Sequence, residues 1–200
     1  MAVVAVSLLY PHVIGNRLAP FLMLPVLAYT LWQFVDWVVP DAMMLLAFGG
    51  AGITVGFALF AAGLPISTAN PQAFLQNSVR RLSRLLKSPE NLSLLLFQAV
   101  FIVYEELIWR VFLTHALIPV MPTLLVILIA GTLFWFVHEE NRTAGGHSIE
   151  FLLFSFALTA LYIFTDSLLF VLMIHATRNL LILSGFQDAP SKSGLNGENV

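Results

Sequence analysis

The sequence contains no cysteine and very little charge. Its 200 residues include 9 Lys+Arg and 11 Asp+Glu, so 10% of the chain is charged while 59% is hydrophobic. Without cysteine, the chain can form no disulfide, thiolate nucleophile or cysteine metal site. A soluble domain is about one quarter charged, and no basic patch with interleaved aromatic residues indicates nucleic-acid binding. We therefore expect a single integral membrane domain over residues 1–186, followed by a polar, disordered tail at 187–200.

Long apolar runs predict an all-α fold, a polytopic bundle of about six transmembrane helices. Each span needs about 20 mostly apolar residues. The last apolar run, 149–186, is interrupted at Thr165-Asp166-Ser167, and we expect Thr165 or Asp166 to cap its second helix. The predicted spans are residues 18–39, 42–63, 92–118, 121–138, and the two halves of 149–186.

Within the second span, Gly52 and Gly56 form a small-xxx-small pair. Such pairs let the backbones of two membrane helices approach closely. We therefore predict a tight helix contact at these two positions.

Residues 64–90 break the pattern of spans. Asn70 followed by Pro71 predicts a helix start, and the apolar residues that follow recur at helical spacing with basic residues on the other face. We expect this amphipathic helix to lie on an anionic leaflet. Its basic residues also place it in the cytoplasm by the positive-inside rule. If the first two spans form a hairpin, both termini are then cytoplasmic. Separately, we expect this multi-pass protein to reside in a bacterial or archaeal cell membrane.

The stretch YEELIWR places three charged residues inside the third span. Glu106 and Arg110 are four residues apart, so they meet on one face of an α-helix and Arg110 can neutralise Glu106. Glu105 points about 100° away and lines up with the apolar Trp109. It has no charged partner on its own helix, which suits a general base. A purely structural ion pair is an equally weighted alternative for this pattern.

Two further polar groups lie on other spans. FWFVH ends the fourth span with His138, and HATRN places His175 and Asn179 on one face of the sixth. A pair of N–H donors suits an oxyanion hole, although histidine and asparagine also form ordinary interhelical hydrogen bonds. A water held between Glu105 and His138, facing His175 and Asn179, would form a peptide-hydrolysis site.

The three stretches resemble the motifs of a known family. EELIWR, FWFVH and HATRN have the order and register of EExxxR, FxxxH and HxxxN in the CPBP family, which includes type II CAAX prenyl endopeptidases and bacteriocin-processing or Abi-type membrane proteins. The resemblance covers about half the chain, residues 92–184. Two positions depart from the usual pattern, because Val111 replaces a common glycine and Trp109 a commoner phenylalanine.

This resemblance implies an intramembrane glutamic endopeptidase that needs no cofactor. Its substrate would be a membrane-anchored or lipidated protein, with a prenylated substrate and a C-terminally anchored one equally weighted. By position, the residues implied are Glu105 as general base, His138 as its partner on the water, His175 and Asn179 as oxyanion donors, and Glu106 and Arg110 as supports.

Three alternatives stay open. A zinc protease would use Glu105, His138 and His175 as ligands, although the HExxH motif is broken because Arg142 stands in HEENR where the second histidine belongs. An ion or proton transporter would use the same ionisable groups as a path. A relative without protease activity would bind a membrane peptide in an immunity or chaperone role.

Overall fold

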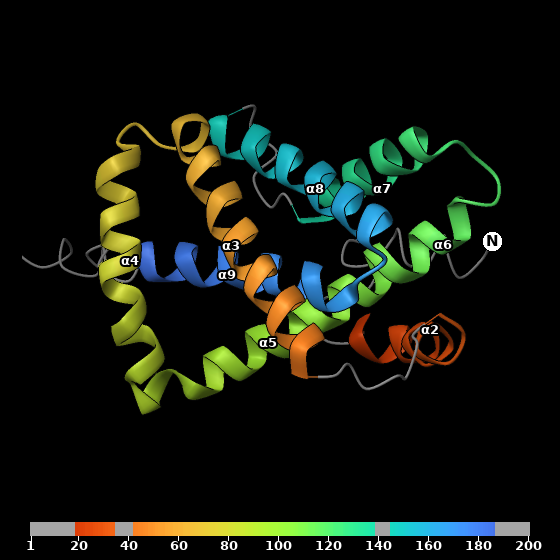
Figure 1. The fold of residues 1–200 in the computed structure, drawn as a ribbon, viewed down its shortest axis with the longest axis horizontal. Helices are drawn as coiled ribbons and strands as arrows, with labels where there is room; N and C mark the ends of the chain where they lie inside the picture. The colour runs from red at the N-terminus through yellow and green to blue at the C-terminus, as the bar shows by residue number, and fades with distance from the viewer. Residues whose placement is uncertain (1–18, 35–41, 139–144, 187–200) are drawn as a thin grey trace, which may run out of the picture.

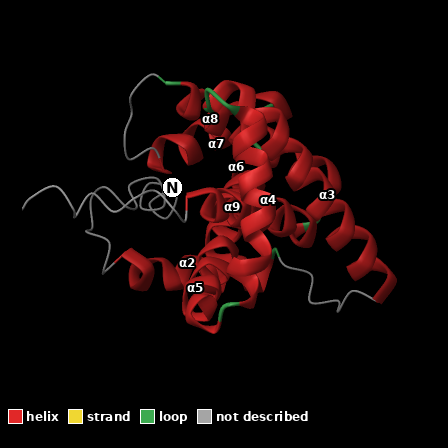
Figure 2. Cartoon of the chain, turned by 90° about the vertical axis from the view of Figure 1, so that its left-hand side faces the viewer, coloured by secondary structure: helices red, strands yellow, loops and turns green. Residues whose placement is uncertain are grey.

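The computed structural model describes residues 19–34, 42–138 and 145–186. Within these ranges the chain is helical and contains no strand (Figures 1 and 2), which confirms the predicted all-α class. The predicted tail, the polar loop that follows His138, and both chain ends lie outside the described residues. The helices that carry the fold are α2 Ala19–Gln33, α3 Ala42–Ser67, α4 Pro71–Lys87, α5 Leu92–Glu106, α6 Leu113–Leu117, α7 Thr123–His138, α8 Gly146–Thr165 and α9 Leu168–Phe186.

Four of the described helical segments are long and apolar enough to cross a membrane. They are Ala42–Ser67, Pro89–Leu117, Gly146–Thr165 and Leu168–Gly185. The other two predicted spans correspond to shorter helices, α2 with 15 residues and α7 with 16. At ~1.5 Å per residue, 16 residues extend about 24 Å, whereas the hydrocarbon core is about 30 Å thick. The helical bundle is thus confirmed, with four helices of full spanning length.

Helices α3 and α9 pack closely at the predicted glycine pair. A Cβ atom on Gly52 would lie 2.7 Å from Cβ of Met173, and one on Gly56 would lie 2.7 Å from the carbonyl oxygen of Ile174. Neither position has room for a side chain unless the two helices move apart. The prediction of a tight helix contact is therefore confirmed.

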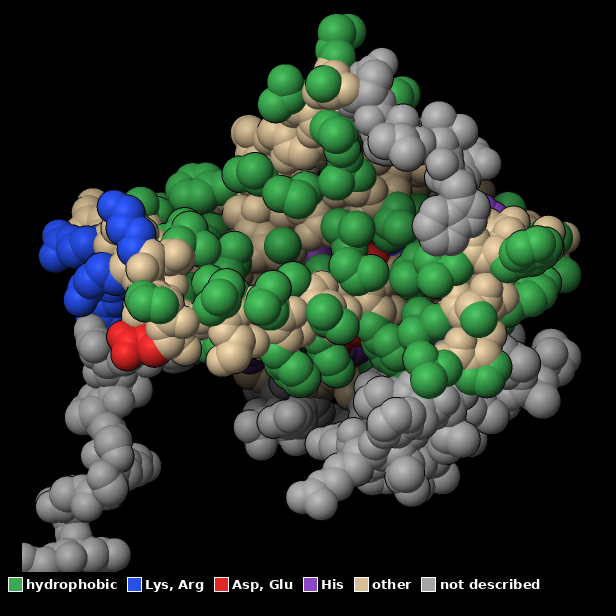
Figure 3. Space-filling model, turned by 90° about the horizontal axis from the view of Figure 1, so that it is seen from below, with side chains coloured by type: hydrophobic (Ala, Val, Ile, Leu, Met, Phe, Trp, Pro, Cys, Tyr) green, Lys and Arg blue, Asp and Glu red, His purple; other side chains and the backbone are tan. Residues whose placement is uncertain are grey.

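Helix α4 lies across the C-terminal end of α9 (Figure 1). It begins as predicted, because Oδ1 of Asn70 accepts a hydrogen bond from the N–H of Ala73 at 3.2 Å and Pro71 is the first helical residue. Its inner face is tied to α9, where the hydroxyl of Ser184 donates to the carbonyl of Ser78 at 2.9 Å. Its basic side chains gather at one end of the molecule, beside a largely apolar face (Figure 3). This geometry suits a helix lying along a membrane surface.

The turn between α8 and α9 corrects one prediction. Neither Thr165 nor Asp166 caps α9; instead the hydroxyl of Ser167 accepts from the N–H of Phe170 at 3.2 Å. Asp166 ends α8 in the left-handed conformation, with φ of 48°, and its N–H donates to the carbonyl of Tyr162. The reason is that Asp tolerates the left-handed region better than most residues, so it serves the end of one helix rather than the start of the next.

Candidate active site

The two glutamates of YEELIWR end an α-helix and precede a wider turn. Helix α5 stops at Glu106, and Leu107–Phe112 (η2) forms a π-helical segment before α6 begins. Every residue of η2 is buried. Trp109 packs with Phe134 in one core cluster, and Val111 packs with Ile174 in another. Single π-helical turns inside α-helices frequently occur at functional sites. Ordinary α-helical spacing, on which the prediction for YEELIWR rests, therefore does not hold across Leu107–Phe112.

Glu105 contacts a histidine from another helix. Its Oε1 atom lies 2.7 Å from Nε2 of His138, which is the last residue of α7. The carboxylate is buried, with 5% of its side chain exposed, while 24% of the His138 side chain is exposed. The pair is therefore anchored inside the bundle and reachable from outside through the imidazole.

His175 lies between the two glutamates. Its Nδ1 atom is 2.7 Å from Oε1 of Glu106, and its Nε2 atom is 3.7 Å from Oε2 of Glu105. All three side chains are buried. Helix α9 thereby brings one imidazole against both acids, and the described structure joins the first and third motifs directly.

Arg110 and Glu106 form the predicted ion pair. Nε of Arg110 lies 3.5 Å from Oε2 of Glu106, and neither side chain has any exposed surface. The guanidinium also lies 3.8 Å over the ring of Phe134. Its nitrogens have no hydrogen-bond partner among the described residues. The compensation for burying this cation therefore comes from the carboxylate and from the face of the aromatic ring.

The hydrogen bonds of His138 fix where its protons lie. Nδ1 is 2.7 Å from the carbonyl oxygen of Phe134, and because a carbonyl can only accept, Nδ1 carries a hydrogen. In neutral His138 the Nε2 atom then has none. An ionised Glu105 is also only an acceptor, so their 2.7 Å contact requires one further proton, held by either partner. Glu105 and His138 therefore form a pair that shares one proton.

This arrangement corrects the expected surroundings of Glu105. The spacing on its own helix paired it with Trp109 and left it without a charged partner on that helix, and a water was expected between it and His138. In the structure its two oxygens face the imidazoles of His138 and His175, while Trp109 packs edge-on against Phe134. Spacing along one helix reports only the neighbours on that helix, whereas both partners of Glu105 come from other helices.

Asn179 is the one predicted site residue that lies apart from this cluster. It lines a mostly apolar cavity of about 160 Å³ between α4, α5 and α9, together with Gln98 and Ile102. Its side chain has no hydrogen bond to any described residue. The structure thus brings together Glu105, Glu106, Arg110, His138 and His175, and places Asn179 one helical turn beyond them.

The sequence also allowed Glu105, His138 and His175 to be zinc ligands. Among the described residues, no group of three or more His, Asp or Glu side chains is arranged to hold a metal ion. The shortest contact in the cluster, between Glu105 and His138, is a hydrogen-bonded one.

A second buried ion pair, Glu150 with Arg178, was not predicted. Nη2 of Arg178 lies 2.6 Å from Oε2 of Glu150. A signal was present in the sequence, because Arg178 stands inside HATRN and an ionisable residue within a membrane span needs a partner. The partner itself could not be chosen from the sequence, since it depends on how α8 and α9 face each other.

Comparison with known proteins agrees with the motifs. Residues 88–181 match the family model described as type II CAAX prenyl endopeptidase Rce1-like, and this segment contains every predicted site residue. No curated protein and no solved structure shows a significant match. Together with the four apolar helices of spanning length, the match makes the chain an integral membrane protein, and the family implies a protease. Over residues 88–181 the chain is therefore similar to the Rce1-like family of type II CAAX prenyl endopeptidases.

Proposed function

We propose that this protein hydrolyses a peptide bond of a membrane-associated substrate with a water molecule activated by Glu105. The observation that carries the proposal is the 2.7 Å contact between Glu105 and His138, buried among apolar helices. In the proposed resting state Nε2 of His138 carries the shared proton and donates it in a hydrogen bond to Oε1, so the carboxylate of Glu105 is ionised. Oε2 has only the more distant His175 nearby, at 3.7 Å, and is available to accept a proton from water. General-base catalysis of this kind contributes about 10²–10⁴-fold to a rate.

In the proposed reaction, Oε2 of Glu105 takes a proton as the water oxygen bonds to the substrate carbonyl carbon. The tetrahedral intermediate then collapses and its C–N bond breaks. The proton held by Glu105 passes to the amine nitrogen, so the products are an amine and a carboxylic acid. Glu105 returns to its starting state, and no other reactant is consumed.

The remaining residues receive supporting roles. Glu106 accepts the Nδ1–H of His175 and so fixes the orientation of that imidazole, while Arg110 neutralises Glu106. Because its Nδ1–H is held by Glu106, His175 can donate from Nε2 to an oxyanion only when both ring nitrogens carry a hydrogen. We propose that Asn179 supplies the second donor, after its amide turns out of the neighbouring cavity.

The proposed substrate is a membrane-anchored or lipidated protein, either a prenylated CAAX-type chain or one with a C-terminal anchor. His138 is the exposed member of the cluster, so the scissile bond would approach along α7. The basic side of α4 suggests that this occurs at the cytoplasmic face. We further propose that the protein resides in a bacterial or archaeal cell membrane.

The test is cleavage by purified protein in liposomes, with a farnesylated CAAX peptide and a C-terminally anchored peptide as separate substrates. Wild type should cleave one of them, and Glu105→Gln should reduce the rate by at least ~10². Glu90→Gln, which alters an exposed glutamate, is the matched control and should retain full activity. Unchanged cleavage by Glu105→Gln would sink the mechanism.

A chelator arm addresses the zinc reading. We expect activity to survive prolonged treatment with 1,10-phenanthroline, because the proposed water is activated by the carboxylate. If the chelator abolishes cleavage and added zinc restores it, Glu105, His138 and His175 bind a metal rather than transfer protons.

A further inference from the structure

Glu150 of α8 and Arg178 of α9 form a buried, two-pronged ion pair. Nε of Arg178 donates to Oε1 of Glu150 at 3.2 Å, and Nη2 donates to Oε2 at 2.6 Å. Only 3% of Arg178 and 7% of Glu150 is exposed. Paired hydrogen bonds of this kind fix the plane of the guanidinium as well as its position. Neither residue has a role in the reaction proposed above.

The plane so fixed lies against two phenylalanines of α8. The guanidinium carbon of Arg178 is 4.5 Å from the ring centre of Phe154 and 5.2 Å from that of Phe151. A cation over an aromatic face is attracted to it, more strongly where water is excluded. Arg178 therefore restrains both rings as well as joining two helices.

These same rings contact the two histidines of the candidate active site. Phe154 lies edge-on to His175 with ring centres 6.0 Å apart, and Phe151 lies edge-on to His138, also at 6.0 Å. Edge-to-face contacts depend on ring orientation. A rotation of either phenylalanine would therefore be felt by an imidazole.

The opposite side of the site has the same construction. Arg110 is paired with Glu106 and lies 3.8 Å over the ring of Phe134, which in turn lies 4.2 Å from the imidazole of His138. Three phenylalanine rings thus surround the two imidazoles. On one side of them lies the guanidinium of Arg110, paired with Glu106. On the other side lies the guanidinium of Arg178, paired with Glu150. The third motif supplies one of these guanidiniums through Arg178.

We propose that Glu150 and Arg178 are positioning residues for the reaction, acting through Phe151 and Phe154 to hold the imidazoles of His138 and His175 in register with Glu105. This inference rests on the proposed function. His138 has the greatest need of such support, because 24% of its side chain is exposed. A displacement of about 1 Å in a catalytic group can lower a rate by roughly 10².

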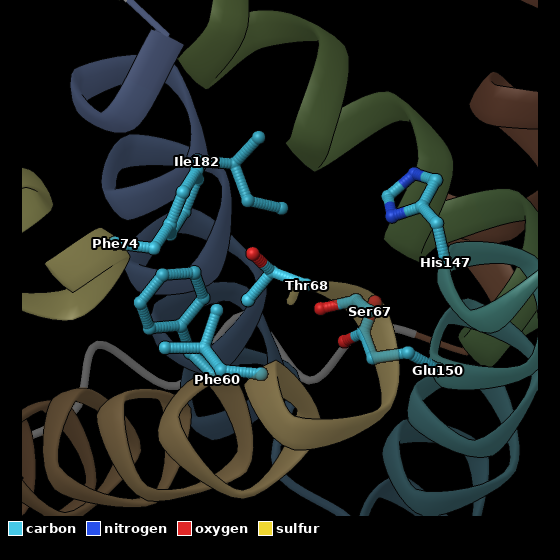
Figure 4. A pocket seen from close by; sticks show the side chains of 8 residues that line it. Phe60, Ser67, Thr68, Phe74, His147, Glu150 and Ile182 are labelled. Atoms are coloured by element: carbon cyan, nitrogen blue, oxygen red, sulfur yellow. The ribbon is translucent and has the colours of Figure 1, made fainter. Parts of the chain in front are cut away.

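The surroundings of Glu150 make a charge exchange feasible. On one side Gly63 of α3 closes on it, so that a Cβ atom there would lie 2.6 Å from Cγ of Glu150. On the other side is a cavity of about 260 Å³, where Glu150 and His147 face Phe74 across open space (Figure 4). A longer side chain at position 150 has room to extend into this cavity. Arginine can therefore replace Glu150 while a carboxylate replaces Arg178.

The first experiment separates positioning from a simple clamp between α8 and α9. Arg178→Gln should lower kcat about 10–100-fold with little change in KM, as loss of a supporting partner does at other sites. The exchanged double variant Glu150→Arg/Arg178→Glu should regain the thermal stability of wild type. It should not regain kcat, because a carboxylate at position 178 cannot lie on the faces of Phe151 and Phe154.

Two results would overturn the inference. The first is a wild-type kcat in Arg178→Gln. The second is full recovery of both stability and kcat in the exchanged variant, because this would show that the ion pair only joins the two helices. If Arg178→Gln cannot be purified in folded form, Glu150→Gln is measured in the same way. This variant keeps the guanidinium but gives it a neutral partner, and it should show the same fall in kcat. Cleavage by wild type in the same assay establishes the proposed function separately.

The second experiment needs no cleavage. In protein with ¹⁵N-labelled histidine in micelles, Arg178→Lys should shift the imidazole NMR signals of His138 and His175. His115 is the internal control, because its ring stacks on Phe34 and is held by the carbonyl of Val111, and its signal should stay in place. Unshifted signals from both site histidines would overturn the positioning role even if the protein proves to be an active protease.

Discussion

Nε2 of His138 lies 2.7 Å from Oε1 of Glu105, although 33 positions separate the two residues in the chain. The other imidazole nitrogen is held by a backbone carbonyl, so the pair must share a proton. Two groups that share a proton react as a unit. Their effects on the rate should therefore overlap.

A double-mutant comparison measures this overlap. Glu105→Gln and His138→Gln should each lower the single-turnover cleavage rate by at least ~10². The double variant should be scarcely slower than Glu105→Gln alone, because removing either member already disables the pair. The rates are measured in liposomes with the peptide that the wild-type protein cleaves. Losses that multiply in the double variant would mean that the two residues act independently.

Arg110 should be essential for stability because Glu106 is fully buried beside it. Arg110→Met leaves an uncompensated carboxylate, which typically destabilises a protein by about 3–5 kcal/mol. Adding Glu106→Gln should restore much of the lost stability but not the activity, since His175 then lacks its charged partner. Thermal unfolding in detergent measures the first effect and peptide cleavage the second.

The control for this series is Arg84→Met on the exposed side of α4. A surface change of this kind should alter stability by no more than about 0.5 kcal/mol. If Arg110→Met were as stable as Arg84→Met, the guanidinium would not be the group that neutralises Glu106.

The contact between α3 and α9 should be sensitive to a single methyl group. Gly56→Ala places a Cβ atom 2.7 Å from the carbonyl oxygen of Ile174, and overpacking of this kind costs about 1–3 kcal/mol. Gly50→Ala is the matched control, because nothing lies within 4 Å of its Cβ position. It should leave the unfolding temperature unchanged or slightly higher. Equal unfolding temperatures for the two variants would contradict the close packing.

Much of the fold was predictable because each relevant signal is local. The positions of the spans follow from apolar runs, the cap at Asn70 from its neighbour Pro71, and the Glu106–Arg110 pair from helical spacing. Even there, a local rule misplaced one cap, because Asp166 adopted the left-handed conformation that ends the preceding helix. Ser167 caps the N-terminus of α9 instead.

The arrangement of the site was less predictable because it depends on contacts between helices. No spacing rule places His175 against both glutamates, or Arg178 against Glu150. The π-helical segment Leu107–Phe112 has the same apolar composition as the α-helix around it and leaves no mark in the hydrophobic pattern. These features follow from the way separate helices meet, which a single sequence does not specify by inspection.

The role of Asn179 can be tested against a neighbour in the same cavity. Asn179 and Gln98 both line the space between α4, α5 and α9, so Asn179→Ala and Gln98→Ala remove similar amide groups from similar surroundings. If Asn179 turns to stabilise the oxyanion, Asn179→Ala should lower kcat by about 10²–10³ with KM unchanged, while Gln98→Ala should leave both constants near wild type. Equal kinetic effects of the two substitutions would show that Asn179 only lines the cavity. The oxyanion would then depend on His175 alone. Because Nδ1 of His175 is already bonded to Glu106, its one free donor would be a protonated Nε2.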